Sequence, residues 1–106
     1  MSRVPGKAGE LPALEHEIAG EMAAALGRSG RRLEAALQRL REHDAGLAPA
    51  SGQEDARRAE LLVDAADAYW CHIVQREAMG LSGTERVADD YEVPLEVRRH
   101  AGPKRR

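Results

Sequence analysis

Side chains that often carry chemistry lie close together between Asp64 and Leu81. This stretch contains the only tryptophan and the only cysteine of the chain, Trp70 and Cys71, and His72 follows at once. A cysteine activated by a histidine base is a strong nucleophile. Neighbouring residues on a helix, however, point about 100° apart, so Cys71 and His72 cannot both bind one metal, and the sequence offers no third member for a nucleophilic site. The stretch also lacks a glycine-rich turn that would stabilise an oxyanion, and we therefore expect no catalytic residues and no enzymatic activity.

The histidine and cysteine spacings also argue against a metal site. Zinc and di-iron sites on helices use pairs such as Glu-x-x-His, His-x-x-x-His or Cys-x-x-Cys, whose members share one helix face. None of these pairs occurs in the sequence, and the Glu-His-Glu run at residues 15–17 points its side chains in different directions. The Gly-Arg-Ser-Gly run at residues 27–30 lacks the lysine of a phosphate-binding loop. We expect no metal and no other cofactor.

Glu77 is the residue of this stretch whose position is unusual. It falls one turn beyond Ile73, in the middle of the apolar arc of the helix expected here. A carboxylate in such an arc must be paired or protonated, or it must lie near the helix end in water. We favour a buried ion pair, either with an arginine of the preceding helix or with His16. The arginines available for this pair are Arg28, Arg32 and Arg39.

The composition indicates that helices position these residues. The length of 106 residues suits a single domain, and the bias toward Ala, Leu, Glu and Arg is typical of helices. Phenylalanine is absent and aromatic residues make up 3%, so the core must be thin. We expect a flexible N-terminal tail over residues 1–10, one helical domain over 11–102 and a basic tail over 103–106. A single cysteine, no signal peptide and no long apolar run favour a cytoplasmic protein that does not cross a membrane.

An apolar stripe with steps of three and four residues predicts a long first helix over about residues 13–44. The stripe keeps its phase on both sides of residues 27–30, so we expect one continuous helix that bends at most at the two glycines there. Pro12 suits the first position of this helix, and Gly46 suits its end. The stripe consists of Leu11, Leu14, Ile18, Met22, Ala25, Ser29, Leu33, Ala36 and Leu40.

A capping box, Ser51-x-x-Glu54, predicts a second helix over about residues 52–79, with Gly80 after its end. The short linker makes the two helices an antiparallel hairpin. The predicted inward arc of the second helix is Ala59, Leu62, Val63, Ala66, Tyr69, Trp70, Ile73 and Val74, with His72 at its edge. The residues expected to form the core or an interaction surface are Leu14, Ile18, Met22, Leu33, Leu40, Leu62, Tyr69, Trp70, Ile73 and Val74.

Two short helices, over about residues 83–91 and 94–101, are expected after the hairpin, the first opened by a capping box at Ser82-x-x-Glu85. Their order of apolar residues is similar to that of a helix-turn-helix with a basic end. The residues available for phosphate contacts are Arg98, Arg99, Lys104, Arg105 and Arg106. Against this, Glu92 replaces the usual turn glycine, and the net charge of the chain is −2. We favour a lid that covers the hairpin, with DNA binding as the alternative.

Five groups of residues between 11 and 102 carry a family resemblance. They are Leu14-Glu15-x-Glu17-Ile18 with Glu21, Leu26-Gly27-Arg28-x-Gly30-Arg31-x-Leu33-Glu34, Trp70, Val74-Gln75-Arg76-Glu77-Ala78-x-Gly80-Leu81 and Val93-Pro94-x-Glu96-Val97. In these groups the chain resembles a family of short bacterial proteins known as a domain of unknown function. The resemblance implies a bacterial origin and brings no activity with it.

These patterns together predict an all-α protein, in which a long antiparallel helical hairpin is followed by two short C-terminal helices. The stripe of the first helix has more apolar length than one partner helix and a small lid can cover. We therefore expect a homodimer with a four-helix core and, as function, a small interaction or assembly module. A DNA-binding regulator that uses residues 84–100 and the basic tail is the alternative function.

Overall fold

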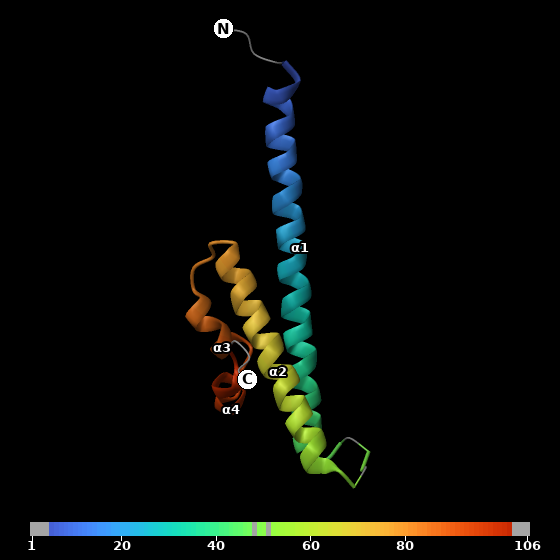
Figure 1. Cartoon of the computed structure of the whole chain (residues 1–106). Helices are drawn as coiled ribbons and strands as arrows, with labels where there is room; N and C mark the ends of the chain where they lie inside the picture. Colours follow the sequence, from blue (N-terminus) through green and yellow to red (C-terminus); the bar gives the residue numbers. More distant parts are fainter. Residues whose placement is uncertain (1–4, 48, 51, 103–106) are drawn as a thin grey trace.

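The structure, a computed structural model, describes residues 5–47, 49–50 and 52–102, with side chains from Leu11 onward. These residues form helices and connecting turns, and none of them is in a strand (Figure 1). The helices are α1 (Pro5–Asp44), α2 (Glu54–Ala78), the 3-10 helix η1 (Thr84–Arg86), α3 (Val87–Asp90) and α4 (Leu95–His100). The predicted fold class, a long helical hairpin with short C-terminal helices, is confirmed.

Helix α1 is one continuous helix of 40 residues, about 60 Å long. It passes residues 27–30 without a break, as the constant phase of its apolar stripe predicted. Its start was predicted wrongly. Pro5, rather than Pro12, takes the first helical position, and Pro12 lies inside the helix. Residues 5–10, which were assigned to the tail, are therefore helical, whereas residues 1–4 and the basic tail at 103–106 lie outside the described residues.

Glycines end both long helices, as predicted. Gly46 has a φ of 73° and Gly80 a φ of 69°, values that favour glycine over other residues. The N–H of Gly46 donates to the carbonyl of His43 (3.0 Å), and the next N–H, of Leu47, donates to the carbonyl of Glu42 (2.9 Å). This pair of bonds satisfies carbonyls that have no partner within the helix.

The start of α2 differs from the prediction by two residues. The N-cap residue is Gln53, and the carboxylate of Glu54 accepts a hydrogen bond from the backbone N–H of Gly52 (3.1 Å). Ser51, the first residue of the predicted capping box, lies outside the described residues. The second predicted box is wrong, because the residue that precedes η1 as its N-cap is Gly83, with a φ of 76°, and not Ser82.

The two long helices pack side by side in opposite directions but differ in length. Side-chain contacts join Ser29 to His72, Arg32 to Asp67 and Asp44 to Arg58. These three contacts share one register, which places the end of α2 beside about residue 23 of α1. The first part of α1 therefore projects beyond the hairpin by roughly 27 Å (Figure 1).

The C-terminal helices pack against α2 (Figure 1), and Tyr91, in the turn after α3, also reaches Gly30 of α1. Helix α4 and the turn before it contribute Val97 and Val93 to a single core, whose other largest fully buried side chains are Leu33 and Leu37 of α1. The remaining core residues are Ala36, Leu40, Leu61, Leu62, Ala65, Ala66, Ala68, Val87 and Ala88. Alanine and leucine supply most of this core, which is as thin as the composition predicted.

The inward face of α2 is rotated from the predicted arc. The residues of α2 that are buried are Leu61, Leu62, Ala65, Ala66, Ala68 and His72. Val63 and Val74, which were predicted to face inward, are 50% and 43% exposed. Alanine faces α1 because small side chains let two helix backbones approach closely, whereas the prediction followed the bulkiest side chains.

Candidate functional site

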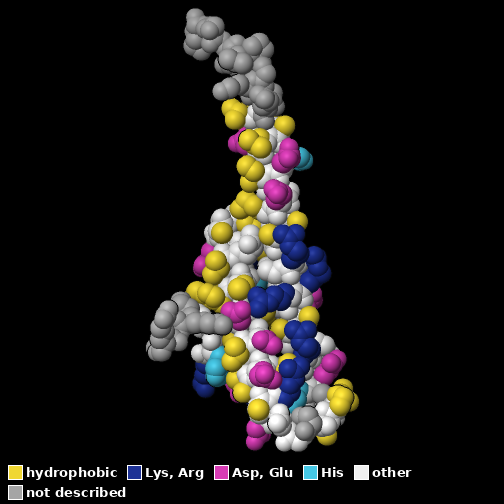
Figure 2. Space-filling model, turned by 45° about the vertical axis from the view of Figure 1, so that its right-hand side comes forward, with side chains coloured by type: hydrophobic (Ala, Val, Ile, Leu, Met, Phe, Trp, Pro, Cys, Tyr) yellow, Lys and Arg dark blue, Asp and Glu magenta, His cyan; other side chains and the backbone are white. Residues whose placement is uncertain are grey.

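The part of α1 that projects beyond α2 carries a row of large apolar side chains. Leu11, Leu14 and Ile18 are 61%, 53% and 50% exposed, and Met22 is half-buried. Figure 2 shows hydrophobic side chains along the projecting part of the molecule. We call Leu11, Leu14, Ile18 and Met22 the projecting stripe.

The projecting stripe continues the face of α1 that α2 covers further along the helix. Spacings of three and four residues connect Met22 through Ala25 and Ser29 to Leu33, which is fully buried. Full burial of one such aliphatic side chain is worth about 1.5–3 kcal/mol. A second helix laid along this face would therefore gain a substantial part of its binding energy from these residues.

A second apolar row lies on the outer face of α2. Val63 and Val74 are about half-exposed, and Trp70, between them, is partly buried and stands apart from the main core cluster. Trp70 and Val74 were predicted to point into the core, but they lie at its edge and outside it. Exposed scattered apolar residues are ordinary, so this row by itself indicates no function.

A polar cluster joins the middle of α1 to α2 and to the end of α3. The hydroxyl of Ser29 lies 2.7 Å from Nδ1 of His72, and it donates to the carbonyl of Leu26 (2.9 Å). The ring of Tyr91 meets the ring of His72 edge to face, with centroids 5.4 Å apart. His72 is 4% exposed, so this cluster places a titratable ring inside the protein.

The geometry of the cluster suits support of the fold better than catalysis. Because the hydroxyl proton of Ser29 is directed to the Leu26 carbonyl, Nδ1 of His72 acts as donor and leaves the serine unactivated. Burial, and secondly the charge of Arg76, lower the pKa of His72. No hydrogen bond from His72 to a carboxylate is seen in the described part of the chain. The neutral ring therefore fills a polar gap between the helices.

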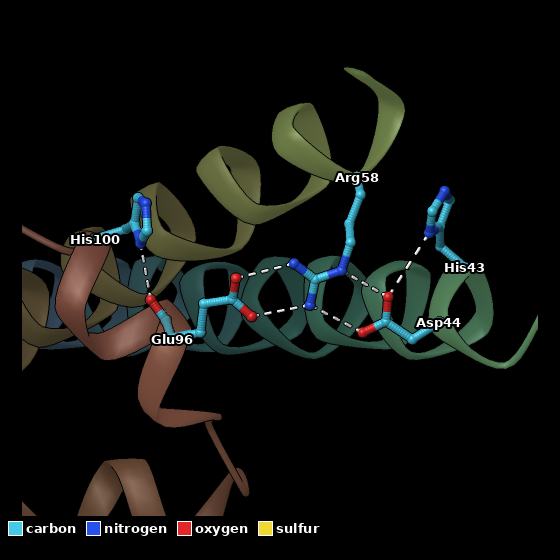
Figure 3. Close-up of polar contacts among 5 residues, drawn as sticks. All are labelled: His43, Asp44, Arg58, Glu96 and His100. Carbon is cyan, nitrogen blue, oxygen red and sulfur yellow. Dashed lines mark hydrogen bonds and ion pairs between the residues drawn. The ribbon is translucent and has the colours of Figure 1, made fainter. Parts of the chain in front are cut away.

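Arg58 joins three helices near the closed end of the hairpin (Figure 3). Its guanidinium group donates two hydrogen bonds to Asp44 of α1 (2.8 and 3.1 Å) and two to Glu96 of α4 (both 2.9 Å). This contact with Arg58 lowers the pKa of both carboxyl groups and raises the pKa of the guanidinium. Nδ1 of His43 lies 3.7 Å from Asp44, and His100 donates from Nδ1 to the carbonyl of Glu96 (2.9 Å). A guanidinium group that makes two hydrogen bonds to each of two carboxylates holds the helices that carry them in a defined geometry.

The sequence-predicted residues are divided among the core, its edge and the surface. Leu33, Leu40 and Leu62 are buried, and Tyr69 and Ile73 pack partly buried against the core. Glu77 is exposed, which contradicts the predicted burial, because the inward face of α2 is rotated away from it. None of the ion pairs seen among the described residues involves Glu77.

The residues that hold the helices together were missed by the sequence analysis. Ser29 was counted only as a position of the apolar stripe, His72 was placed at an edge, and Arg58 was not singled out. A signal was present, because Arg58, Leu61, Ala65, Ala68 and His72 follow one another by three or four residues. That spacing places Arg58 and His72 on the inward face.

The basic residues near the C-terminus, which were predicted as possible phosphate contacts, are only partly free to bind a phosphate. Nε of Arg98 donates to the carbonyl of Val93 (3.0 Å), and its guanidinium lies 3.8 Å from the carboxylate of Asp89. Arg99 is exposed, and Lys104, Arg105 and Arg106 lie outside the described residues. Helix α4 has six residues, and its Val97 is buried in the core, so this segment is short for a recognition helix.

Metal-ligand clusters and membrane-spanning segments are both absent from the described part of the chain. Among residues 5–47, 49–50 and 52–102, no three His, Cys, Asp or Glu side chains lie together as metal ligands. Over the same residues, the helices contain no segment whose length and hydropathy would let it cross a bilayer.

Comparison with known proteins places the chain in a family but gives it no relative of known activity. A comparison with the curated proteins and a comparison with the solved structures each found no significant match. One family model, described as a family of unknown function (DUF6665), matches residues 1–104. The chain therefore belongs to the DUF6665 family, in agreement with the resemblance carried by its sequence groups.

Proposed function

We propose that the protein is a small assembly module that works as a homodimer joined through the projecting stripe. The observation that carries this proposal is the half-exposed row of Leu11, Leu14 and Ile18, in phase with the buried face of the same helix. A second copy laid on this row would give the four helices of two hairpins a shared core.

The surface of a single chain supports the proposal. Its accessible area is 7846 Å², whereas a compact monomer of this mass exposes about 5800 Å². Its radius of gyration is 19.4 Å, against about 13 Å for a compact chain of this length. A standard interface takes about 800 Å² from each partner, so the excess area is large enough for one.

The thinness of the core points in the same direction. Five of the buried core residues are alanine, which adds little apolar area, and none is phenylalanine. Small helical proteins with so few large buried side chains gain stability when they associate. Association through the projecting stripe would add large aliphatic side chains to those already buried.

Sedimentation equilibrium of the full chain tests the proposal. A mass about twice the monomer mass of 11.6 kDa is expected at micromolar concentration. The double variant Leu14→Ser, Ile18→Ser should shift the protein toward the monomer while circular dichroism shows an intact helical fold. Leu95→Ser is the matched control, because Leu95 is also 56% exposed but lies on α4. A monomeric wild-type protein at high concentration would refute the proposal.

DNA binding by residues 84–100 is the second prediction, and the same preparation tests it. A regulator of that kind would bind random duplex DNA at low salt, with an affinity that falls steeply as salt rises. Arg98 already donates to the carbonyl of Val93 and lies close to the carboxylate of Asp89, and Val97 is buried in the core. Both observations weigh against DNA binding by this segment. Absence of binding at low salt would remove this alternative.

A further inference from the structure

The two halves of α1 carry opposite charge. Between residues 11 and 22 the charged residues are Glu15, Glu17 and Glu21, with no lysine or arginine. Between residues 28 and 41 they are Arg28, Arg31, Arg32, Arg39 and Arg41, with Glu34 as the single acidic residue. Figure 2 shows the same division, with acidic side chains along the projecting part and dark blue side chains only below it. Two α1 helices side by side in opposite directions would each lay an acidic half on a basic half.

Four of these charges lie on one edge of the projecting stripe. Glu17, Glu21, Arg28 and Arg32 follow one another at steps of four, seven and four residues, which keeps them on one helix face. All four are exposed. Within the described residues, Arg32 has an ion pair with Asp67 (2.8 Å), and the other three charges belong to none of the ion pairs.

We propose that the second copy docks antiparallel along the edge of α1 that carries these four charges, beside α2, with Glu21 facing Arg28 and Glu17 facing Arg32 of the other copy. This inference rests on the proposed homodimer and gives its geometry. Both pairs occur in the same register, and a two-fold axis makes each of them occur twice. In an antiparallel pair of helices the same edge of each helix meets its counterpart, so all four charges find a partner of opposite sign.

The side chains around the two-fold axis fit a close crossing. In this register the axis passes between Ala24 and Ala25, whose small side chains let the two backbones approach. Leu14 of one copy lies opposite Ala35 of the other, which is exposed in the single chain. In the same register Met22 lies opposite Gly27, whereas Leu11 and Ile18 lie opposite the longer side chains of Gln38 and Arg31.

The charges of α1 also favour this register over two other arrangements of the two helices. A parallel pair of α1 helices would bring each acidic half against the acidic half of the other copy. An antiparallel pair in which only the projecting parts overlap would centre near Leu14 and gather Glu15 and Glu17 of both copies close together, with no lysine or arginine between residues 11 and 22 to face them. Both arrangements place like charges side by side, which opposes association.

Cysteine cross-linking distinguishes the registers. In a Cys71→Ser background, Ala24→Cys and Ala25→Cys each place a thiol beside the two-fold axis, and mild oxidation of at least one should give a covalent dimer. In the same background, Glu15→Cys is the control, because the two thiols would lie roughly 30 Å apart. Cross-linking at position 15 and at neither central position would overturn the register.

Charge reversal gives an independent test. Glu17→Arg, Glu21→Arg makes all four charges positive, and Arg28→Glu, Arg32→Glu makes all four negative. Each double variant alone should dimerise at least about tenfold more weakly than wild type, and an equal mixture should form a tight heterodimer. The single variants Glu21→Arg and Arg28→Glu repeat the comparison with the Arg32–Asp67 ion pair intact.

The outcomes separate the inference from the proposed function. A wild-type chain that sediments as a monomer refutes both. A wild-type dimer whose reversed variants give no heterodimer refutes the register alone and leaves the proposed homodimer in place. A heterodimer from the mixed variants, together with a central cross-link, supports both.

Discussion

The hydroxyl oxygen of Tyr91 lies against the α-carbon of Gly30, where any side chain would meet it. A methyl group at position 30 would come 2.7 Å from this oxygen and 3.4 Å from Cε1 of His72. Position 30 therefore needs glycine, because any side chain there would overlap Tyr91. This holds although the backbone is helical at this position and glycine is a poor helix former. The contact ties the turn after α3 directly to α1, across the end of the polar cluster of Ser29 and His72.

Gly30→Ala should destabilise the protein by about 1–2 kcal/mol, because the overlap with Tyr91 outweighs the better helix propensity of alanine. The measurement is chemical unfolding followed by circular dichroism at one protein concentration. Tyr91→Phe removes the oxygen that is overlapped, so the loss caused by Gly30→Ala should be smaller in that background. Gly20→Ala is the matched control, because a methyl group there meets nothing within 4 Å beyond its own turns of helix backbone, and it should stabilise by about 1 kcal/mol. Equal effects at positions 20 and 30 would contradict the contact.

The continuous α1 helix could be predicted from the sequence, but the position of Gly30 against Tyr91 could not. Phase along a helix is local, so the stripe on both sides of residues 27–30 was enough to exclude a turn. Whether a small residue faces solvent or another element depends on how distant segments pack. Gly27 lies in the same Gly-Arg-Ser-Gly run as Gly30, yet the only side chain near its missing Cβ is that of Arg31, one turn away.

The face of α2 was predicted wrongly for a related reason. Val63, Trp70 and Val74 were taken as inward because they are large, but the face that meets α1 contains Ala65 and Ala68, which are fully buried. Side-chain volume indicates which residues gain most from burial, and it does not indicate where backbones come closest. A contact among three helices, such as that of Arg58 with Asp44 and Glu96, depends on the tertiary arrangement of the helices. It therefore could not be predicted from the sequence alone.

Arg58→Lys should lower the melting temperature by a few degrees. A lysine ammonium group cannot make two parallel hydrogen bonds to each of two carboxylates, which the guanidinium of Arg58 does with Asp44 and Glu96. The measurement is thermal unfolding near neutral pH. The neighbouring Arg57→Lys is the control, since Arg57 has a single looser contact with Glu60 at 3.6 Å. If both variants melt alike, the four-bond arrangement contributes little.

The same contact predicts a loss of stability in acid. The pKa values of Asp44 and Glu96 are lowered in the folded protein from their ordinary values of 3.8 and 4.5. A lowered carboxyl pKa gives stability that is present above the ordinary value and is lost as the pH falls through the folded value. Unfolding midpoints of wild type should therefore drop below about pH 4, and Arg58→Met should show a shallower drop. An unchanged pH profile in Arg58→Met would show that other carboxylates dominate.

Glu92→Gly should stabilise the protein by up to about 1 kcal/mol. Glu92 has a φ of 53° and ends α3 as a non-glycine residue in the left-handed region. Its N–H donates to Asp89 (3.1 Å) and the following N–H, of Val93, to Ala88 (2.8 Å), the pattern in which glycine is usual. Unfolding of the variant by urea checks the gain. Glu92→Ala, which removes the carboxylate but keeps the strained φ, should bring no comparable gain, and an equal gain would assign the effect to charge.

The burial of His72 predicts a second pH dependence at higher pH. Because burial and the charge of Arg76 lower its pKa in the folded protein, the unfolded chain binds a proton more readily. Stability should therefore decline as the pH falls below about 6.5, the ordinary value for histidine, and continue to decline until the folded value is reached. His72→Gln keeps a polar side chain beside Ser29 but cannot titrate, so its stability should depend less on pH between about 5 and 7. His16→Gln is the control, because His16 is exposed on the projecting part of α1. A pH profile that changes in His16→Gln and not in His72→Gln would show that the dependence arises away from the polar cluster.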